Sequence, residues 1–392
     1  MNAMNAMNAF SPTQADAASA LGTGVYIHVP FCASKCAYCD FYSRVRRDQK
    51  EGYLSALTAE IRRASAESLR TGSLFFGGGT PSLLEKEDFE RIFSALSGSL
   101  PILPGAEITL EANPETVSPD SLRTLRSLGF NRISFGVQSA VDRELRALGR
   151  RHTFARAKEA FLAAREAGFD NISLDLMLGI PFQTAESLDA TLSEVLALRP
   201  QHLSCYLLKI EEGTPFYRRH AEKDCASDDE TADFYLTVCR TLAKAGYHHY
   251  EISNFALPGF ESRHNLKYWR DEPYLGFGPA AHSCLHEKRL YNPSDLDRYL
   301  ASDGDCALSE DDAPAGTADE RLMLGLRLSE GISLSDIARK APDFTPSRQR
   351  SFSEKAAPFV RAGLMEGDGE HFSLTERGML VSNMLLAELL DW

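Results

Sequence analysis

Between about residues 24 and 208, short apolar runs alternate with amphipathic stretches, and this alternation restricts the possible folds more than any other feature. Six runs read as strands: Val25–Val29, Leu74–Phe76, Ile108–Glu111, Arg132–Phe135, Ile172–Met177 and His202–Tyr206. The stretches between them carry apolar residues at helical spacing: Tyr53–Ile61, Phe89–Leu96, Leu122–Leu128, Ala155–Ala167 and Leu188–Leu198. Repeated βα units predict parallel strands joined by right-handed crossovers. A closed barrel needs eight units, so the sequence predicts an α/β fold with an open, partial (βα)6 barrel.

Functional residues of such folds gather where the strands end and on the loops that follow. The unusual residues of this chain all fall there. The Cys32–Cys39 loop follows the first strand, the Gly77–Gly79 run follows the second, and Glu111 ends the third. Gln138 follows the fourth strand, and Asp175 lies near the end of the fifth. We therefore expect a single site at this edge of the sheet.

The most specific motif is a C-x3-C-x2-C loop formed by Cys32, Cys36 and Cys39. Three thiolates on one short loop can ligate three irons of a cubane 4Fe–4S cluster, which leaves the fourth iron open to a small chelator. The alternative is half of a zinc site, which would need a second C-x2-C pair elsewhere. The sequence has no second pair. The loop therefore predicts an iron–sulfur cluster.

The other residues at this edge suit a polar ligand. A glycine run lets the backbone approach a ligand closely, although a tight βα turn would explain it equally well. Glu111 and Asp175 are acids within apolar strands, where an unpaired charge is costly. They either bind the hydroxyls and amine of a nucleoside or form salt bridges to a barrel arginine, such as Arg132 or Arg150. Arg150 also offers a guanidinium fork for a carboxylate, and Gln138 offers an amide.

Several motifs together resemble the HemN/HemW branch of the radical S-adenosylmethionine (SAM) superfamily: the cysteine loop, GGGTPS, NRISFGVQS, LGRRH, DLMLGIP and YEISNFA. The resemblance runs from about Tyr26 to the C-terminus. It implies a 4Fe–4S cluster on Cys32, Cys36 and Cys39, with SAM as a second cofactor. The residues that it implies as SAM contacts are Tyr26, Tyr38, Gly78, Gly79, Thr80, Glu111, Gln138, Arg150 and Asp175. Within this set we assign Arg150 to the methionyl carboxylate of SAM and Asp175 to the ribose.

This branch contains oxygen-independent coproporphyrinogen III oxidases and haem chaperones that resemble them. The oxidases have a fourth cysteine in a C-x3-C-x2-C-x-C motif, whereas Phe41 stands at that position here. This chain also carries an HNxxYW motif, His264–Trp269, which matches the haem-binding signature of the chaperones. The resemblance therefore implies a protein that binds haem as cargo and delivers it to acceptor haemoproteins, such as respiratory enzymes, without catalysing a reaction. The alternative is an oxidase that converts coproporphyrinogen propionates to vinyl groups.

The residues of the HNxxYW motif have chemistry that suits haem. The imidazole of His264 is a good axial ligand for haem iron, and Tyr268 and Trp269 suit the porphyrin face. The alternative is a histidine with satisfied hydrogen bonds beside two aromatic residues of the core. His282 is a second candidate ligand, which we expect to line the SAM or substrate cavity instead.

Composition sets the remaining expectations. Residues 1–22 read as a disordered leader without the basic start or apolar run of a signal peptide, which favours the cytoplasm. We expect the partial barrel over 23–208, an extension with the HNxxYW motif over 209–303, a linker over 304–317 and a winged-helix-like domain over 318–392. The net charge of −13 argues against nucleic acid as a partner. The last domain is also acidic, so we expect it to pack or dock, while dimer formation and docking at a membrane stay open.

Overall fold

Six parallel strands occupy the centre of the sheet, in the order in which they occur along the chain. They are β1 (Thr23–Val29), β2 (Thr71–Gly78), β3 (Ile102–Ala112), β4 (Arg132–Gln138), β5 (Asn171–Leu178) and β6 (His202–Leu207). The computed structural model describes residues 22–45, 48–302, 309–310 and 315–390. The expected leader and most of the expected linker lie outside these residues. The predicted α/β class with a partial barrel is confirmed.

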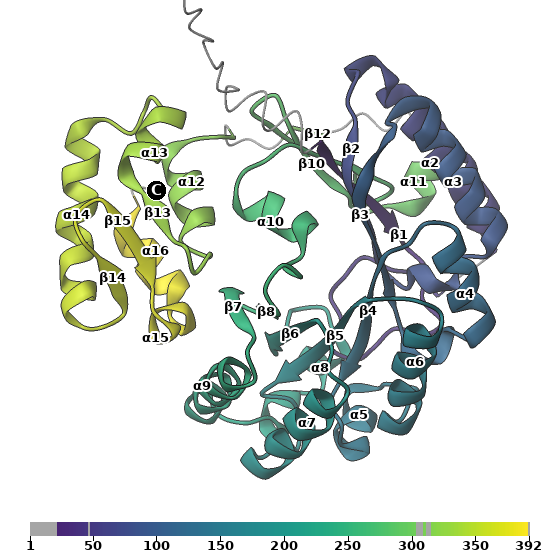
Figure 1. Ribbon diagram of the computed structural model, residues 1–392, viewed down its shortest axis with the longest axis horizontal. Helices are drawn as coiled ribbons and strands as arrows, with labels where there is room; N and C mark the ends of the chain where they lie inside the picture. The colour runs from purple at the N-terminus through teal and green to yellow at the C-terminus, as the bar shows by residue number, and fades with distance from the viewer. Residues whose placement is uncertain (1–21, 46–47, 303–308, 311–314, 391–392) are drawn as a thin grey trace, which may run out of the picture.

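Helices cover the convex face of these strands (Figure 1). They are α2 (Lys50–Arg63), α3 (Lys86–Ser99), α4 (Pro119–Ser127), α5 (Asp142–Leu148), α6 (Phe154–Glu166) and α7 (Ala185–Ala197). Ser118, Thr153 and Thr184 begin α4, α6 and α7, because each side chain accepts a hydrogen bond from a backbone N–H of the first turn. The sequence did not predict α5, since seven residues are too few to show a helical period.

The parallel strands present apolar residues to the helices and polar residues to the concave face. The outward side chains are fully buried against the helices; examples are Val25, Ile27, Leu74, Leu110, Ile133, Phe135, Leu174 and Leu203. The inward side chains line cavities; examples are Glu111, Arg132, Ser134, Asp175 and Ser204. The interior of a closed (βα)8 barrel is filled by branched apolar side chains. A polar interior instead leaves room for a ligand.

Six short strands extend the sheet at its two edges. They are β7 (His248–Glu251), β8 (Asn254–Ala256), β9 (Tyr274–Phe277), β10 (His282–Leu285), β11 (Lys288–Tyr291) and β12 (Ser309–Glu310). Strand β9 pairs in parallel with β1, and β8 pairs antiparallel with β6. The strands β8 to β12 have two to four residues each, too few to give a readable alternation in the sequence.

Four helices accompany these edge strands: α8 (Pro215–Arg218), α9 (Asp228–Lys244), α10 (Arg263–Trp269) and α11 (Leu296–Ala301). Helix α9 begins at Asp228, because Ser227 and Glu230 form a capping box. Helix α10 carries the HNxxYW motif and lies on the concave side of the sheet (Figure 1). No helix among the described residues is long and apolar enough to cross a bilayer.

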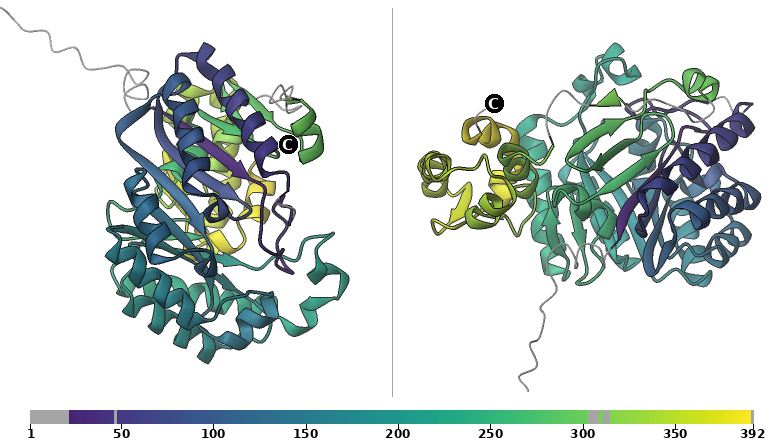
Figure 2. Two further views of the ribbon diagram at one scale, coloured as in Figure 1. Left: turned by 90° about the vertical axis from the view of Figure 1, so that its right-hand side faces the viewer. Right: turned by 90° about the horizontal axis from the view of Figure 1, so that it is seen from above.

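The C-terminal part has the helix–strand–helix–helix–strand–strand order of a winged helix. Its elements are α12 (Ala318–Gly325), β13 (Ile332–Ser333), α13 (Leu334–Lys340), α14 (Pro346–Arg361), β14 (Met365–Gly367), β15 (His371–Leu374), α15 (Glu376–Leu380) and α16 (Ser382–Leu389). The last two helices, α15 and α16, meet at Val381. This part lies to one side of the barrel, where α15 packs on α9 and α12 packs on α10 (Figure 2).

Candidate functional site

A cavity of about 500 Å³ lies where the parallel strands end, a volume typical of small-molecule sites. The loop after β1 and the ends of β2 to β6 supply its walls. The cavity brings together most of the residues that the sequence singled out: Cys32, Cys36, Tyr38, Cys39, Gly78, Gly79, Thr80, Glu111, Gln138, Arg150 and Asp175. Of the expected SAM contacts, Tyr26 lies outside this main cavity.

The cysteine loop is held against the barrel through its backbone. Cys32 N–H donates to the carbonyl of Arg44 at 2.9 Å, and Thr80 N–H donates to the carbonyl of Phe31 at 2.7 Å. Two side chains also donate to sulfur: the Thr80 hydroxyl to Cys32 Sγ at 3.6 Å and Arg150 Nη1 to Cys36 Sγ at 3.5 Å. Such donors stabilise a thiolate. Burial raises the pKa of the Cys39 thiol to about 11, so a metal ion must displace its proton on binding.

The three sulfurs fit a cubane cluster better than a single ion. All three cysteines are free of disulfide bonds. Within the described chain, Cys32, Cys36 and Cys39 do not form a group whose ligand atoms converge to within 4.8 Å of one another. One tetrahedral zinc ion would need that convergence, whereas a 4Fe–4S cluster holds its thiolates on separate irons.

The glycine run is required by packing as well as by any ligand. A Cβ on Gly78 would lie 2.6 Å from the His28 ring, and one on Gly79 would lie 2.6 Å from the Phe31 carbonyl oxygen. Gly78 also has a φ of +103°, which side chains rarely adopt. The end of β2 can therefore approach β1 and the cysteine loop only without side chains. Both glycines still line the cavity, as predicted.

Arg150 is built into the cavity wall with one hydrogen-bonding group left over. Its Nη2 donates to Asn113 Oδ1 at 2.7 Å and to the Gly136 carbonyl at 2.5 Å. Its Nε is buried without a partner among the residues that the structure describes. A buried donor without a partner costs about 1–3 kcal/mol. The free Nε therefore suits an anionic group that enters the cavity, such as the carboxylate of an amino acid.

Space for this guanidinium depends on Gly136 at the end of β4. A Cβ at that position would lie 2.9 Å from Arg150 Nη2 and 2.9 Å from Gln138 Nε2. Gln138 itself has a φ of +70°, which is rare for a residue with a side chain. Strained backbone of this kind concentrates at ligand sites.

Glu111 and Asp175 face the cavity, where the charge of Arg132 opposes the rise in the pKa of both carboxyls from a distance. In the described chain, neither forms an ion pair with Arg132 or Arg150. Burial raises the pKa of Glu111 to about 8, and the nearby charge of Asp175 adds to the rise. Burial also raises the pKa of Asp175, although hydrogen bonds from Ser134, at 2.9 Å, and from Ser204 oppose the change. The two carboxyls are available to the hydroxyl and amine groups of a ligand.

A smaller cavity of about 200 Å³ adjoins the main one inside the half-barrel. The two share Gly78, Glu111, Ser134, Asp175 and Tyr206 among their lining residues. We call the smaller one the inner cavity. Its remaining wall includes the last predicted SAM contact and two residues of the HNxxYW motif: Tyr26, His264 and Tyr268.

His264 is fully engaged by protein partners in this structure. Its Nδ1 lies 2.9 Å from Ser73 Oγ, and its Nε2 lies 2.8 Å from the Tyr268 hydroxyl. Its ring stacks on Phe75, with centroids 5.2 Å apart, and 1% of the residue is exposed. Burial lowers the pKa of His264 to about 3, so the imidazole is neutral at physiological pH. Glu107, near the middle of β3, accepts hydrogen bonds from the first N–H groups of α10.

The other aromatic residue of the motif, Trp269, lies outside both cavities. It faces the C-terminal part, where the Arg327 guanidinium lies 5.4 Å from the centre of its ring. The next residue, Arg270, pairs with Glu330 at 3.1 Å. The expectation for His282 is wrong: this residue is exposed on β10 and stacks on Tyr291 of β11, because β10 lies beyond β9 in the extension of the sheet and not among the central parallel strands.

Sequence reasoning missed several residues of the site. Asn113 connects Arg150 to Thr80, because its amide also donates to the Thr80 hydroxyl at 3.1 Å. Phe41 and Tyr206 line both cavities and are 71% and 41% exposed. Asn113 and Tyr206 stand at strand ends, so the rule that located Glu111 applied to them too. A serine such as Ser134 within a strand gives no comparable signal.

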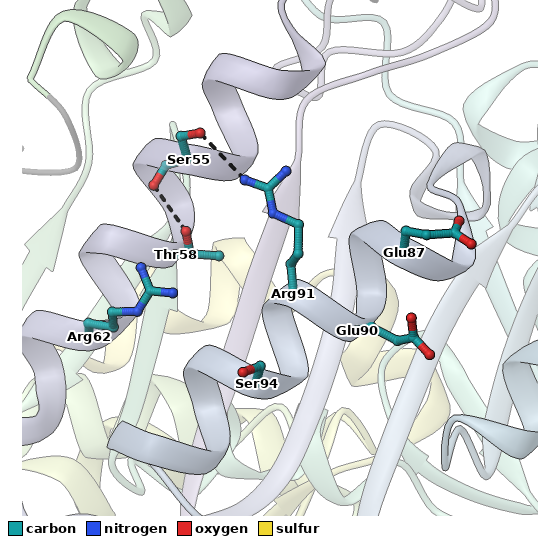
Figure 3. Close-up of a pocket in the computed structure, with 7 residues that line it drawn as sticks. All are labelled: Ser55, Thr58, Arg62, Glu87, Glu90, Arg91 and Ser94. Carbon is teal, nitrogen blue, oxygen red and sulfur yellow. Dashed lines mark hydrogen bonds between the residues drawn. The ribbon is translucent and has the colours of Figure 1, made fainter.

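A further hollow, of about 600 Å³, lies on the outer surface between α2 and α3 (Figure 3). Its walls carry Ser55, Thr58, Arg62, Glu87, Glu90, Arg91 and Ser94. Arg91 crosses it to reach Ser55 at 3.5 Å and Glu51 at 2.8 Å. This hollow contains no predicted site residue and lies behind the strands, so we assign the site to the two cavities on the concave face.

Known proteins match nearly the whole chain. Residues 26–195 match the radical SAM superfamily, and residues 315–381 match the HemN C-terminal domain. Heme chaperone HemW from Escherichia coli is 39% identical over 378 residues, which cover 92% of this chain and 96% of the relative. The Bacillus subtilis protein of the same name is 34% identical over 377 residues, 93% of this chain and 98% of the relative. The chain belongs to the HemW family.

A solved structure supports the same assignment. The coproporphyrinogen III oxidase HemN from Escherichia coli, described as a radical SAM enzyme, is 26% identical with a TM-score of 0.82. It covers 97% of this chain, and this chain covers 93% of it. Membership of the radical SAM superfamily implies a 4Fe–4S cluster and SAM, and the main cavity has the thiols, the guanidinium with a free Nε and the carboxyls that such cofactors require. HemW relatives and HemN thus share one fold, so the fold alone does not separate chaperone from oxidase.

Proposed function

We propose that this protein is a cytoplasmic haem chaperone, which binds haem together with a SAM-loaded 4Fe–4S cluster and delivers the haem to acceptor haemoproteins. The observation that carries the proposal is the likeness, over more than nine-tenths of the chain, to relatives named heme chaperone HemW. Phe41 supports it, because the oxidases that the chain resembles have a fourth cysteine at this position. Respiratory enzymes are the acceptors that we expect, and a dimer or a membrane-docked form belongs to the same proposal.

In this proposal the main cavity holds the two cofactors. Cys32, Cys36 and Cys39 would bind the cluster, and Arg150 would use its free Nε for the methionyl carboxylate of SAM. Asp175 would accept hydrogen bonds from the ribose. A cluster with bound SAM supplies one-electron reduction and a carbon radical, chemistry that a chaperone does not need for turnover. Its role here would be structural or regulatory.

The mouth of the main cavity suits a large apolar ligand. Three apolar or aromatic residues line it and are exposed: Phe41 by 71%, Tyr206 by 41% and Leu207 by 37%. Their contact with water is unfavourable in free energy, and an apolar ligand would remove it. Lys35 and Lys209 also line the cavity and offer cations to carboxylates, although Lys209 pairs with Glu211 at 2.7 Å in this structure. An apolar macrocycle with acidic side groups, as haem is, matches both features.

Haem ligation by His264 requires a change from the conformation in this structure. Both of its ring nitrogens already have partners, and the inner cavity beside it is smaller than the ~300 Å³ at which ordinary ligand pockets begin. Haem can reach His264 only when α10 moves away from Ser73 and Glu107. Ligation by His264, with Tyr268 and Trp269 against the porphyrin, therefore includes a conformational step in this proposal.

A haem titration of the wild type and of His264→Ala tests this assignment. The chain offers a matched control in His202, whose Nδ1 also lies beside a serine, Ser173, and whose Nε2 lies beside a tyrosine hydroxyl, Tyr250, at 2.8 Å each. His202 is equally buried but lines neither cavity. We expect His264→Ala, and not His202→Ala, to lose haem affinity. Equal affinity of the two variants would remove His264 as the ligand.

The oxidase is the second candidate, and the structural likeness to HemN favours it. Anaerobic incubation of the reconstituted protein with SAM, a reductant and coproporphyrinogen III separates the two functions. A chaperone leaves the porphyrinogen unchanged while it transfers haem to an apo-haemoprotein. Conversion to protoporphyrinogen would establish the oxidase and overturn the proposal.

A further inference from the structure

A second group of metal-binding side chains lies at the junction between the barrel and the C-terminal part. Cys239 comes from α9, His249 from β7 and Glu376 from the first turn of α15. One ligand atom from each lies within 4.8 Å of the other two. Cys239 is buried, His249 half-buried and Glu376 exposed, so the group runs from the core to solvent. None of these residues takes part in the site described above.

The imidazole of His249 is already oriented as a ligand. Its Nε2 lies 3.3 Å from the Ile252 carbonyl oxygen, to which it donates, and this leaves the lone pair of Nδ1 facing Cys239 Sγ at 3.9 Å. The ring stacks on Phe255, with centroids 4.2 Å apart and planes inclined by 13°, which fixes its rotation. Histidines that bind metals usually donate their second ring N–H to a backbone carbonyl or carboxylate in this way.

The donor atoms and their spacing define the kind of ion. Zn–S bonds of about 2.3 Å and Zn–N bonds of about 2.1 Å place sulfur and nitrogen roughly 3.6 Å apart in a tetrahedral site. The observed 3.9 Å needs a movement of a few tenths of an ångström. A thiolate, an imidazole and a carboxylate together suit a borderline divalent ion such as Zn²⁺, and hard ions such as Mg²⁺ prefer oxygen alone.

The protonation states allow such an ion to bind. Burial lowers the pKa of His249 to about 4, so the imidazole is neutral at physiological pH and has no proton to lose. Burial and the charge of Glu376 raise the pKa of Cys239 to about 12, so its thiol carries a proton in the metal-free protein. Binding would form the metal–sulfur bond and release that proton to solvent.

We propose that Cys239, His249 and Glu376 bind one Zn²⁺ or a similar tetrahedral cation, with water as the fourth ligand, and that this ion fastens α15 to the barrel. Two of the ligands belong to the barrel side and one belongs to the C-terminal part. Beside them, the Tyr235 hydroxyl of α9 lies 3.7 Å from Met379 Sδ of α15, a weak contact at the same junction. An ion shared by three elements would restrict movement of the C-terminal part.

The test uses full-length protein with its 4Fe–4S cluster reconstituted and Co²⁺ as a spectroscopic substitute for Zn²⁺. We expect one Co²⁺ to bind beyond the cluster irons, with the visible bands of a tetrahedral ion and a thiolate charge-transfer band. C239S should abolish the charge-transfer band, and H249Q and E376Q should each weaken binding at least tenfold. Zn²⁺ should displace the Co²⁺ and raise the temperature at which the wild type unfolds.

Matched variants separate this site from other thiols and histidines. C225S changes another partly buried cysteine, H248Q changes the neighbouring exposed histidine, and E366Q changes an exposed glutamate of the same part of the chain. All three should bind Co²⁺ as the wild type does. Because Glu376 is exposed, E376Q tests the site without disturbing the core. No Co²⁺ beyond the cluster, or Co²⁺ binding that survives both C239S and E376Q, would reduce the group to a thiol–imidazole contact and overturn the proposal.

Discussion

Replacing Glu111 with glutamine should make the protein less sensitive to alkaline pH. Burial raises the pKa of this carboxyl from 4.5 to about 8, so the folded state retains a proton that the unfolded chain loses. The preference for the protonated form therefore stabilises the fold fully below about pH 4.5 and disappears as the pH rises to about 8. The amide of the E111Q variant does not titrate in this range, so the variant would avoid the loss.

The size of the effect follows from the shift. About 3.5 pKa units at roughly 1.4 kcal/mol each give an upper limit of about 5 kcal/mol. Glu111 lines a cavity that water can enter, which lowers our expectation to about 2 kcal/mol. Relative to the wild type, E111Q should thus gain about 2 kcal/mol of unfolding free energy between pH 5 and pH 9.

The assay is urea unfolding of cluster-free, SAM-free wild type and E111Q at pH 5 and pH 9. Titration of other groups cancels in the difference between the two proteins. E115Q is the control: burial raises the pKa of Glu115, but the hydrogen bond from His152 and the charge of Arg150 outweigh burial and lower it overall. The stability that Glu115 contributes is therefore lost only below about pH 4.5, and E115Q should differ from the wild type equally at pH 5 and pH 9. An E111Q variant with the same pH dependence as the wild type would refute the reasoning.

Three further outcomes follow from the contacts. Arg150→Lys keeps the charge but loses the guanidinium fork and the free Nε, so SAM affinity measured by calorimetry should fall by about tenfold or more. Unchanged affinity would remove Arg150 from the SAM site. Gly136→Ala places a Cβ 2.9 Å from Arg150 Nη2 and should weaken SAM binding with little loss of cluster iron, whereas wild-type affinity would mean that the guanidinium is free to move. Phe76→Ala removes a ring that packs against Phe89 and Phe130, whose ring centroids lie 5.5 Å and 5.3 Å away. The substitution should lower the free energy of unfolding by about 3–5 kcal/mol, and a loss below about 1 kcal/mol would contradict the packing described.

The sequence predicted the barrel well because each long strand is followed by a helix with readable periodicity. It also located Glu111, Gln138, Arg150 and Asp175 near one rim, since parallel strands end at the same edge. It did not show that the two acids belong to an alternating polar face, which also includes Ser134 and Ser204. That face is visible only once the register of neighbouring strands is known.

Other features could not be read from the sequence for physical reasons. The short edge strands depend on pairing: β9 pairs with β1, β8 pairs with β6, and the remaining strands pair outward from these two. The burial of His264 against Ser73 depends on a contact between residues far apart in the chain. The polar partners of a histidine decide whether it can bind iron, and the residues next to it in the sequence do not reveal those partners.

Helix α10 lies between the buried interior of the half-barrel and the C-terminal part on the outside of the barrel. Its inner side contributes His264 and Tyr268 to the interior of the half-barrel, while its far end holds Arg327 over Trp269 and Glu330 against Arg270. A displacement of this helix must therefore strain or break these two contacts with the C-terminal part. A macromolecule that bound the C-terminal part and displaced it would therefore also displace the buried imidazole of His264, without entering the barrel.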